Sequence, residues 1–334
     1  MAETDTLPPF LWLTERDVTS LINLSGVIAA LERALVLEAE GKAKNMYKAQ
    51  TVWDQGSTNV TGAQFVSEGF SGGKIWTNVG GSSEPLTVLH GAADGKLRAI
   101  IESIALGTMR TAALASVATK FLAAEGADDL AIIGTGKQSL TQVAAVHAVR
   151  PLKRLRVFSP TPANRAAFVE LVKSKYTFEV VNAPSIEAAV KDAPIISTFT
   201  RARAPFLSAD MIAKGAHLNA GGAIVPAYAE ITPDVVGRAS LIVVDNIEQC
   251  RENARELNDA FAAGIGGGWN QVRQLSAVVK AGKPRPAGTD LTLYKFMGVG
   301  LADLAAGIEI YRRAVAQGKG TKRDHAVRAP VDLS

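Results

Sequence analysis

Apolar residues recur with a helical period in the first part of the chain. Val27, Leu31 and Leu35 lie four residues apart, so they share one face of a predicted amphipathic helix. Ser25 is the expected N-cap of this helix, and Gly41 is its expected end. The segment therefore predicts a helix that buries one face against a larger structure.

A different pattern follows between residues 49 and 103, where short runs of Val, Ile, Thr and Trp alternate with Gly, Ser, Asn and Asp. Such runs predict the strands of an antiparallel sheet, with tight turns at sites such as Asp94-Gly95. The next segment has a helical pattern of small residues and ends at Gly126. Since small side chains allow helices to pack closely, we expect a buried helix that connects two parts of the chain.

From Asp129 onward, short apolar runs alternate with helical segments. This alternation predicts a doubly wound parallel sheet of the Rossmann type. The apolar runs occupy residues 130–134, 154–159, 178–182, 194–199, 216–221 and 241–246. A last amphipathic helix, over residues 299–318, needs a surface for its apolar face, and we expect it to return to the first part of the chain.

The fold class predicted from these patterns is α/β, with a Rossmann-type sheet over residues 121–297. Residues 1–120 and 298–334 form a second, α+β domain in this prediction. The length of 334 residues, with 47% hydrophobic and 20% charged residues, agrees with two domains that bury a large interior.

Composition also excludes several classes of protein. The 36 basic and 32 acidic residues nearly balance, so we expect no nucleic-acid partner. The single cysteine, Cys250, allows no internal disulfide and is expected to be buried in a helix. The first ten residues lack the basic and apolar regions of a secretory signal, and no run of 18 apolar residues is present. We therefore expect a cytoplasmic protein without a membrane partner.

The most informative motif is the turn Gly134-Thr135-Gly136, which joins an apolar strand to a helix expected to start at about Lys137. Gly134 allows a tight turn, and Gly136 lets a pyrophosphate approach the backbone at the helix N-terminus. Ser139 stands in place of the third glycine of the usual fingerprint and is small enough to keep the helix close to the strand. The motif predicts a nicotinamide dinucleotide as cofactor.

The end of the next strand indicates which dinucleotide is bound. Ser159 lies 23 residues after Gly136, near the position of the usual ribose-binding acid, but no acid occurs there. Ser159, Thr161 and Arg165 offer hydroxyls and a positive charge, which suit the 2′-phosphate of NADP. The sequence therefore favours NADP. NAD stays possible, since Arg165 could simply be an exposed residue.

Two basic residues are candidates for the chemistry. Lys74 lies in a predicted strand beside Ile75 and Trp76, and apolar surroundings lower the pKa of a lysine, which could then protonate an imine nitrogen. Arg110 lies among small apolar residues, where a guanidinium needs an anionic partner such as a phosphate or carboxylate ligand. An exposed strand lysine and an internal salt bridge are the respective alternatives. No metal-ligand spacing, Ser–His–Asp pattern or P-loop lysine is present.

The chain resembles the ornithine cyclodeaminase/mu-crystallin family from about residue 15 to 318. The segments that carry the resemblance are "GKIWT", "LGTMRTAALASVATKFLA", "IIGTGKQS", "KGAHLNAGG", "PAYAEI" and "TLYKFMGVGLADLAAGIEIY". The resemblance implies a homodimer whose first domain serves dimerisation and substrate binding. It also implies hydride transfer between a nicotinamide and the Cα of an amino or imino acid. Family members include cyclodeaminases, ketimine or imino-acid reductases and alanine dehydrogenases.

The resemblance also implies roles for individual residues. Lys74 matches a lysine that contacts the substrate, and Thr87 and Arg110 match residues that contact substrate or cofactor. Lys137, Gln138, Ser159, Thr200 and residues 218–221 match the cofactor-binding segments of the family. Together with the residues of the glycine turn and of the next strand end, the full set of expected cofactor contacts is Thr87, Arg110, Thr111, Gly134, Thr135, Gly136, Lys137, Gln138, Ser159, Thr161, Arg165, Thr198, Thr200, Asn219 and Gly221.

The chain departs from the family pattern at two sites. Ile224 stands where cyclodeaminases carry an aspartate that activates substrate or water, and isoleucine cannot take up a proton. Gln50 stands where family members carry an arginine that holds the substrate carboxylate. Lys48, two residues earlier in the same expected strand, would face the same side and could replace that arginine.

These observations favour an NAD(P)H-dependent oxidoreductase that interconverts a small imine or ketimine and its amine or amino acid. Lys74 and Arg110 are its expected catalytic residues, and Lys48, Gln50, Lys74 and Thr87 are its expected substrate contacts. A cyclodeaminase that uses bound NAD is the first alternative, and Ile224 counts against it. A nicotinamide-nucleotide-binding protein with little catalysis is the second alternative.

Overall fold

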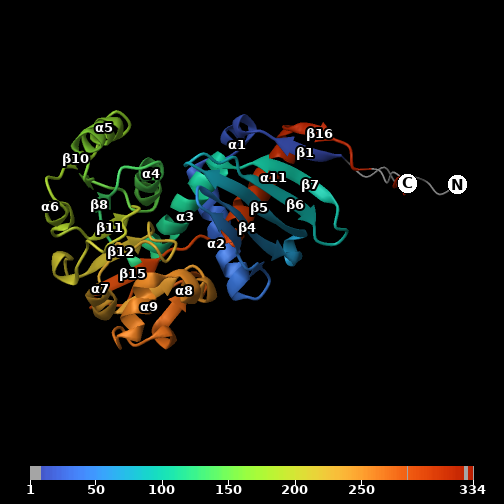
Figure 1. Ribbon diagram of the computed structural model, residues 1–334. Coiled ribbons are helices and arrows are strands. Elements are labelled where there is room, and N and C mark those ends of the chain that lie inside the picture. Colours follow the sequence, from blue (N-terminus) through green and yellow to red (C-terminus); the bar gives the residue numbers. More distant parts are fainter. Residues whose placement is uncertain (1–8, 284, 327–329, 334) are drawn as a thin grey trace.

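A computed structural model describes residues 9–283, 285–326 and 330–333. The first eight residues, on which the expected absence of a secretory signal partly rests, lie outside the described residues. The described chain forms two sheets of eight strands each, joined through α3 (Ile104–Leu122) and through the passage from β15 (Leu291–Lys295) into α11 (Gly300–Gln317). Figure 1 shows the sheets side by side with α3 between them.

The first sheet comes from the N-terminal part of the chain, with one short strand from the C-terminal part. It is antiparallel except where β1 and β7 pair in parallel, so the predicted antiparallel sheet over residues 49–103 is confirmed. Its strands, in spatial order, are β16 (Thr321–Arg323), β1 (Phe10–Leu13), β7 (Leu97–Glu102), β6 (Leu86–Gly91), β5 (Phe70–Val79), β4 (Gly56–Phe65) and β2 (Lys44–Asn45), with β3 (Ala49–Trp53) paired to β4.

Helices cover one face of this sheet. α11 packs on β4, β5 and β6, and α2 (Leu24–Ala39) and α3 pack beside α11. α1 (Glu15–Leu21) lies near β1, and a 3₁₀ turn (Val66–Glu68) follows β4. The last helix therefore returns to the first sheet, as predicted. The expected N-cap of α2 was wrong: Asn23, not Ser25, caps it, because the Asn23 side chain accepts a hydrogen bond from the Gly26 N–H at 2.9 Å.

The second sheet is entirely parallel and confirms the Rossmann-type fold class. All six predicted apolar runs are strands, and β14 and β15 are two further strands that were not predicted. The order in the sheet is β10 (Glu179–Asn182), β9 (Arg154–Phe158), β8 (Asp129–Ile133), β11 (Ile195–Thr198), β12 (Ala216–Ala220), β15, β13 (Leu241–Val244) and β14 (Val272–Gln274). The sequence interpretation missed β15. This strand lies between β12 and β13 in the sheet, although it is the last of the eight strands in the sequence.

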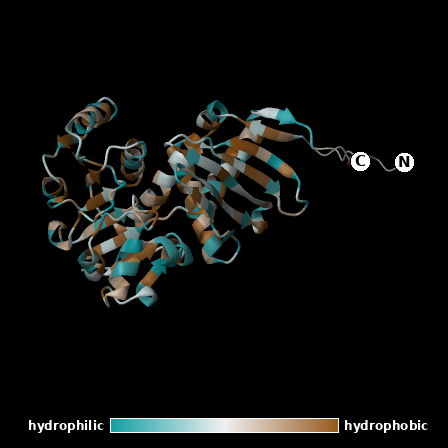
Figure 2. Ribbon diagram, in the orientation of Figure 1, coloured by the Kyte–Doolittle hydropathy of each residue, from teal (hydrophilic) through white to brown (hydrophobic). Residues whose placement is uncertain are grey.

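Short helices connect the strands of the second sheet and cover its faces. They are α4 (Ser139–Val149), α5 (Pro162–Lys173), α6 (Ile186–Val190), α7 (Pro233–Arg238), α8 (Ile247–Asn253), α9 (Arg255–Ala262) and α10 (Leu275–Ala281), with 3₁₀ turns at Ala209–Met211 and Trp269–Gln271. Figure 2 shows hydrophobic segments along the strands of both sheets and hydrophilic ones on the outer surfaces of α8 and α9.

The two sheets share part of their core. Val243, Tyr294 and Phe296 come from the second sheet or its edge, yet they pack in one cluster with Leu31 and Leu304 of the helices on the first sheet. This shared core holds the two halves together along α3 and α11. The domain boundaries predicted at residues 120 and 297 stay a prediction.

Cys250, as expected, and His217 are buried in the second half of the molecule. Cys250 is fully buried in α8. The fully buried His217 contacts Thr292 Oγ1 at 2.9 Å, and burial lowers its pKa to about 3, which keeps the ring neutral. No single described helix is long and apolar enough to cross a membrane; α1 and α2 meet that test only as a pair bent by 83°.

Candidate functional site

The glycine turn at the end of β8 has room for a ligand on one side. Gly134 has φ +108° and a side chain there would approach Phe199 O at 2.9 Å, so the position requires glycine. A Cβ at Gly136 would meet no atom within 4 Å, which leaves open space above the turn. α4 begins at Ser139, two residues after the predicted start, and the buried Ser139 hydroxyl donates to Gly134 O at 2.9 Å.

The side chains of this turn also suit an anionic cofactor. Gln138 Oε1 is buried and has no hydrogen-bond partner among the described residues, and as an acceptor it suits a sugar hydroxyl of the cofactor and not its phosphates. Lys137 Nζ donates to Gly81 O at 3.3 Å and so brings a positive charge to the open side of the turn. The open backbone, the helix N-terminus and this lysine fit the pyrophosphate of a dinucleotide.

The end of β9 carries the residues predicted to distinguish NADP from NAD. The Arg165 guanidinium donates to Ser159 O at 2.8 Å and to Asn182 Oδ1 at 2.6 Å, and it lies over the Phe158 ring. Thr161 is the N-cap residue of α5, and its hydroxyl makes no capping hydrogen bond. The structure thus brings Ser159, Thr161 and Arg165 together, with the guanidinium held beside the strand end.

The remaining predicted cofactor residues lie at the ends of β11 and β12, with different orientations. Thr198 is fully buried, and Thr200 lies in the loop that follows β11. A side chain at Gly221 would collide with the Phe199 ring at 2.4 Å, so this close approach requires glycine. Asn219 was predicted as a cofactor contact, but its side chain points inward and donates to Thr119 Oγ1 at 2.9 Å, which leaves only its backbone for a ligand.

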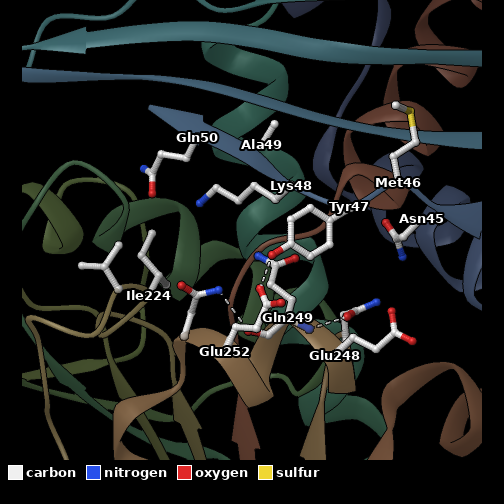
Figure 3. Close-up of a pocket in the computed structure, with 13 residues that line it drawn as sticks. Asn45, Met46, Tyr47, Lys48, Ala49, Gln50, Ile224, Glu248, Gln249 and Glu252 are labelled. Atoms are coloured by element: carbon white, nitrogen blue, oxygen red, sulfur yellow. Dashed lines mark hydrogen bonds between the residues drawn. The ribbon is translucent and has the colours of Figure 1, made fainter. Parts of the chain in front are cut away.

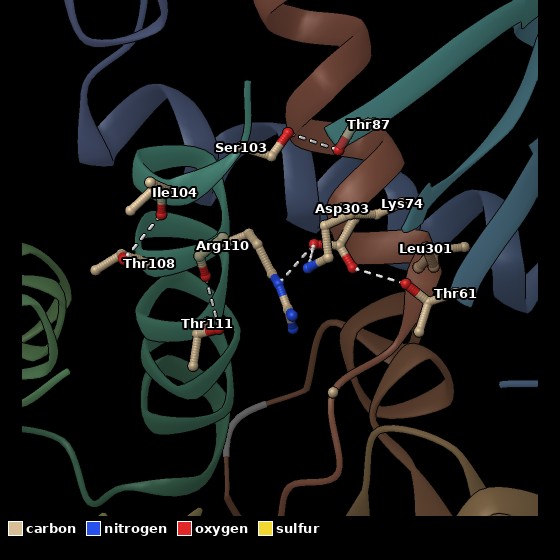
Figure 4. A network of polar contacts seen from close by, with 12 residues as sticks. Thr61, Lys74, Thr87, Ser103, Ile104, Thr108, Arg110, Thr111, Leu301 and Asp303 are labelled. Atoms are coloured by element: carbon tan, nitrogen blue, oxygen red, sulfur yellow. Dashed lines mark hydrogen bonds and ion pairs between the residues drawn. The ribbon is translucent and has the colours of Figure 1, made fainter. Parts of the chain in front are cut away.

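The two basic residues predicted to carry the chemistry meet at one buried carboxylate. Lys74 Nζ on β5 lies 2.6 Å from Asp303 Oδ1, and Arg110 Nε on α3 lies 2.9 Å from the same oxygen. Asp303 belongs to α11, is completely buried, and accepts a third contact from the Thr61 hydroxyl at 3.3 Å. Figure 4 shows the three charged side chains pointing toward one another between α3 and α11.

The environment of this cluster sets its protonation. Burial and repulsion from Arg110 lower the pKa of Lys74 to about 8, although Asp303 opposes the shift. Burial alone would raise the pKa of Asp303, but the charges of Arg110 and Lys74 hold it below its usual value. Near neutral pH, therefore, Asp303 is ionised and Lys74 can exchange a proton.

Arg110 has donors left over after it contacts Asp303. Its Nη1 is buried and has no hydrogen-bond partner among the described residues. Its Nε, although close to Asp303, is not aligned for a hydrogen bond. An unpaired buried donor costs about 1–3 kcal/mol, so this guanidinium is suited to an anionic ligand.

Thr87 and Thr111 lie near this cluster but are engaged within the protein. Thr87 lies opposite Lys74 in the β5–β6 pairing, is completely buried, and accepts a hydrogen bond from the Ser103 hydroxyl at 2.8 Å. The Thr111 hydroxyl donates to Gly107 O at 2.8 Å within α3. Direct ligand contacts of these two threonines stay a prediction.

A cavity of about 420 Å³ opens where the first sheet faces the carboxyl edge of the second. Lys48 and Gln50 line it from the N-terminal half of the chain, and Ile224 lines it from the loop after β12 (Figure 3). Asn246, the N-cap residue of α8, also lines it. The structure corrects one inference: Lys48 precedes β3, which begins at Ala49, so strand alternation does not explain how it reaches the cavity.

Lys48 is the better candidate to hold an anion in this cavity. It makes no hydrogen bond or ion pair with another described residue, and burial together with the charge of Arg110 lowers its pKa, although Asp245 opposes the shift. Gln50, in contrast, donates to Asn59 Oδ1 at 2.7 Å. Lys48 and Arg110 therefore both leave positive donors available at the same side of the site.

Sequence reasoning missed two acidic residues of this region. Asp303 is separated from Lys74 by 229 residues, so no local pattern reveals the pair. Asp245 follows β13, and burial raises its pKa to about 6, although the backbone N–H groups of Met297, Gly298 and Asn246 donate to it. Its place directly after an apolar strand was the one available signal. No group of His, Cys, Asp or Glu in the described chain could hold a metal ion.

Solved structures share the overall fold of this chain, and curated relatives are similar to it in sequence. The Δ¹-pyrroline-2-carboxylate reductase of Thermococcus litoralis, solved with NADH and L-proline, superposes with a TM-score of 0.88 at 26% identity, over 94% of this chain and all of that one. An archaeal alanine dehydrogenase dimer with bound NAD gives a TM-score of 0.87 at 25% identity, over 94% and 99% of the chains. A Δ¹-pyrroline-2-carboxylate reductase of Bacillus cereus is 30% identical over 229 residues, which are 68% of this chain and 70% of the relative.

The site combines a parallel sheet and its glycine turn with a buried lysine–aspartate–arginine cluster. Together with the relatives described above, this architecture identifies the protein as an NAD(P)-dependent oxidoreductase that acts on the carbon–nitrogen bonds of imines and amino acids. The sequence model of the ornithine cyclodeaminase/mu-crystallin family matches residues 11–318, and this chain belongs to that family.

Proposed function

We propose that this enzyme is an NADPH-dependent reductase of a small imino acid, with a cyclic imine such as Δ¹-pyrroline-2-carboxylate as the first substrate to test. The observation that carries the proposal is the Lys74–Asp303–Arg110 cluster, because it combines a proton-exchanging lysine with unpaired cationic donors. The names of the reductase relatives support the same substrate class.

In this proposal, each residue has a separate role in the reaction. Lys48 and the free Nη1 of Arg110 bind the substrate carboxylate, and Lys74 delivers its proton to the imine nitrogen. The nicotinamide supplies the hydride that reduces the imine carbon. Asp303 holds Lys74 and Arg110 at fixed positions, so the proton donor and the carboxylate site keep a constant separation.

We infer a preference for NADP over NAD from the end of β9. Ser159 occupies the usual position of the ribose-binding acid, so no negative charge repels a 2′-phosphate. Arg165 and the Thr161 hydroxyl, which lie beside it, provide donors for that phosphate.

We also propose that the enzyme is a homodimer that pairs through the first sheet. The face of this sheet opposite α11 carries a groove of about 750 Å³, lined among others by Ile75, Val88 and His90, and Ile75 is 47% exposed. The solved archaeal relative is named as a dimer. A cytoplasmic location, predicted from the sequence, belongs to the same proposal.

A cyclodeaminase is less well supported. Ile224 lines the cavity where the activating aspartate of cyclodeaminases is expected, and an isoleucine cannot take up a proton. The nearby Asp245 is completely buried and accepts three backbone N–H groups, so it does not replace that aspartate. Ornithine should therefore release no ammonia in the presence of NAD.

The test combines binding and turnover. Calorimetric titrations with NADPH and with NADH compare the two cofactors, and oxidation of NADPH by Δ¹-pyrroline-2-carboxylate and related imines then measures activity. Lys74→Met should abolish turnover and leave NADPH affinity nearly unchanged, whereas Lys96→Met, at an exposed position of the turn between β6 and β7, should change neither. Full activity of Lys74→Met would refute the role of Lys74, and a protein that binds neither cofactor would refute the whole proposal.

A further inference from the structure

Glu230 belongs to the loop that follows β12, and its side chain is completely buried. Its carboxylate accepts hydrogen bonds from the Thr198 hydroxyl at 2.8 Å, from the Thr200 N–H at 2.6 Å and from the Gly222 N–H at 2.8 Å. One side chain thus joins two loops that are more than twenty residues apart in the sequence.

The contacts of Glu230 are specific to a carboxylate. Among the described residues no lysine, arginine or histidine forms an ion pair with it, so three neutral donors compensate its charge. A side chain at Gly222 would come within 2.3 Å of Glu230 Oε1, so the close fit requires glycine at that position. An amide in place of the carboxylate would bring an N–H donor against the N–H of Thr200 or Gly222.

A second buried carboxylate fixes the position of Glu230. Glu256 accepts the backbone N–H groups of Glu230 at 2.6 Å and of Ile231 at 3.0 Å. The other oxygen of Glu256 lies 2.5 Å from Lys295 Nζ, and both side chains are essentially inaccessible. Lys295 ends the central strand β15, opposite Ala220 of β12. The Glu230 loop is thereby anchored to the middle of the parallel sheet.

The loops that Glu230 joins lie on one side of the topological switch point. The sheet order β10-β9-β8-β11-β12 places the glycine turn and Ser159 on the β8–β9 side and places the Glu230 loops on the β11–β12 side. In a Rossmann fold the dinucleotide lies across this point, with its two halves on opposite sides. The adenosine half belongs to the β8–β9 side, so the β11–β12 side is left for the nicotinamide half.

We propose that Glu230 is the positioning residue for the nicotinamide half of the cofactor, because it holds the loops after β11 and β12 in the conformation that receives the ring. This inference rests on the proposed cofactor function. The Glu230 side chain is buried within these loops and acts through its hydrogen bonds with Thr198, Thr200 and Gly222. Loss of the carboxylate should therefore weaken the binding of the nicotinamide half and leave the adenosine half unaffected.

The experiment compares the whole cofactor with its adenosine fragment. Calorimetry of Glu230→Gln should show NADPH affinity reduced by about 10- to 100-fold, which corresponds to the loss of hydrogen bonds to a charged group. The affinity for 2′,5′-ADP should stay that of the wild type. In turnover, KM for NADPH should rise more than KM for the imine. Glu170→Gln, on the surface of α5, is the matched control and should leave all of these values unchanged.

Thr198→Val is the second variant, since it removes one donor to the same carboxylate and keeps the strand residue β-branched. It should weaken NADPH binding in the same selective manner, which keeps the test open if Glu230→Gln does not fold. Unchanged NADPH affinity in a folded variant would overturn the inference, as would an equal loss of NADPH and 2′,5′-ADP. A wild-type enzyme that does not bind NADPH would refute the proposed function instead, so the two failures are distinguishable.

Discussion

Replacing Asp303 by asparagine removes the counter-charge shared by Lys74 and Arg110 and changes the side-chain volume very little. A neighbouring opposite charge commonly shifts a pKa by about 1–3 units. We therefore expect the pKa of Lys74 to fall from about 8 in the wild type to between about 5 and 7 in the variant. The two cations would also repel each other without compensation.

Stability should change together with this pKa. Removing one partner of a buried ion pair typically costs about 3–5 kcal/mol of unfolding free energy. The folded-state pKa of Lys74 in Asp303→Asn lies far below the unfolded value of 10.5. The unfolded chain then binds more protons between these two values, so the unfolding free energy of the variant should rise with pH across this window.

The assay is the pH dependence of NADPH oxidation by Δ¹-pyrroline-2-carboxylate, with both substrates saturating. Reduction needs protonated Lys74, so the wild-type rate should fall as pH rises through about 8. A shift of the pKa to about 6 lowers the protonated fraction at about pH 7.5 from about three quarters to about 3%, a loss of roughly 25-fold.

The matched control is Asp94→Asn, which breaks the exposed ion pair with Arg98 and should leave the pH profile unchanged. A folded Asp303→Asn enzyme that loses its activity at the same pH as the wild type would refute the reasoning. Either Lys74 would not be the titrating acid, or Asp303 would not control it.

Three further predictions concern binding and assembly. Arg165→Ala should lower NADPH affinity by about tenfold and leave NADH affinity unchanged in calorimetry, because of the two cofactors only NADPH carries the 2′-phosphate that its guanidinium is proposed to bind. Lys48→Met should raise KM for the imino acid by about 10- to 100-fold with a smaller effect on kcat, because it removes a charge that binds the carboxylate in both ground and transition states. Ile75→Asp should produce monomers in analytical ultracentrifugation, because it places a charge on the proposed dimer face.

Each of these predictions has a result that contradicts it. Equal losses of NADPH and NADH affinity in Arg165→Ala would mean that the Arg165 side chain does not bind the 2′-phosphate. An unchanged KM in Lys48→Met would leave Arg110 alone to hold the carboxylate. A dimer that persists in Ile75→Asp would place the subunit interface on another surface.

The sequence predicted the features whose residues are close together along the chain. The glycine turn and the six strands of the parallel sheet depend on short patterns, and the structure agrees with both. Arg110 was expected to pair with an anionic ligand because it lies among small apolar residues, with an internal salt bridge as the alternative, and the structure shows the internal ion pair, with Asp303.

The features that the sequence did not reveal depend on contacts between distant segments. Asp303 reaches Lys74 only because α11 packs on β5, and Glu230 reaches Thr198 only because two loops meet at the sheet edge. Strand β15 was overlooked since nothing near it in the sequence indicates that it inserts between β12 and β13. Lys48 reaches the cavity from outside a strand, so the alternation of strand residues could not place it.

The late insertion of β15 has a consequence for biosynthesis. When the ribosome has completed β13, strands β12 and β13 are still not neighbours, because the strand that joins them has yet to be made. Until residues 291–295 emerge, both strands present unpaired edges, which are prone to pair with other chains. The nascent chain therefore cannot complete its nucleotide-binding half before Lys295 has been translated, and truncation before β15 should yield an aggregating polypeptide in place of an independent domain.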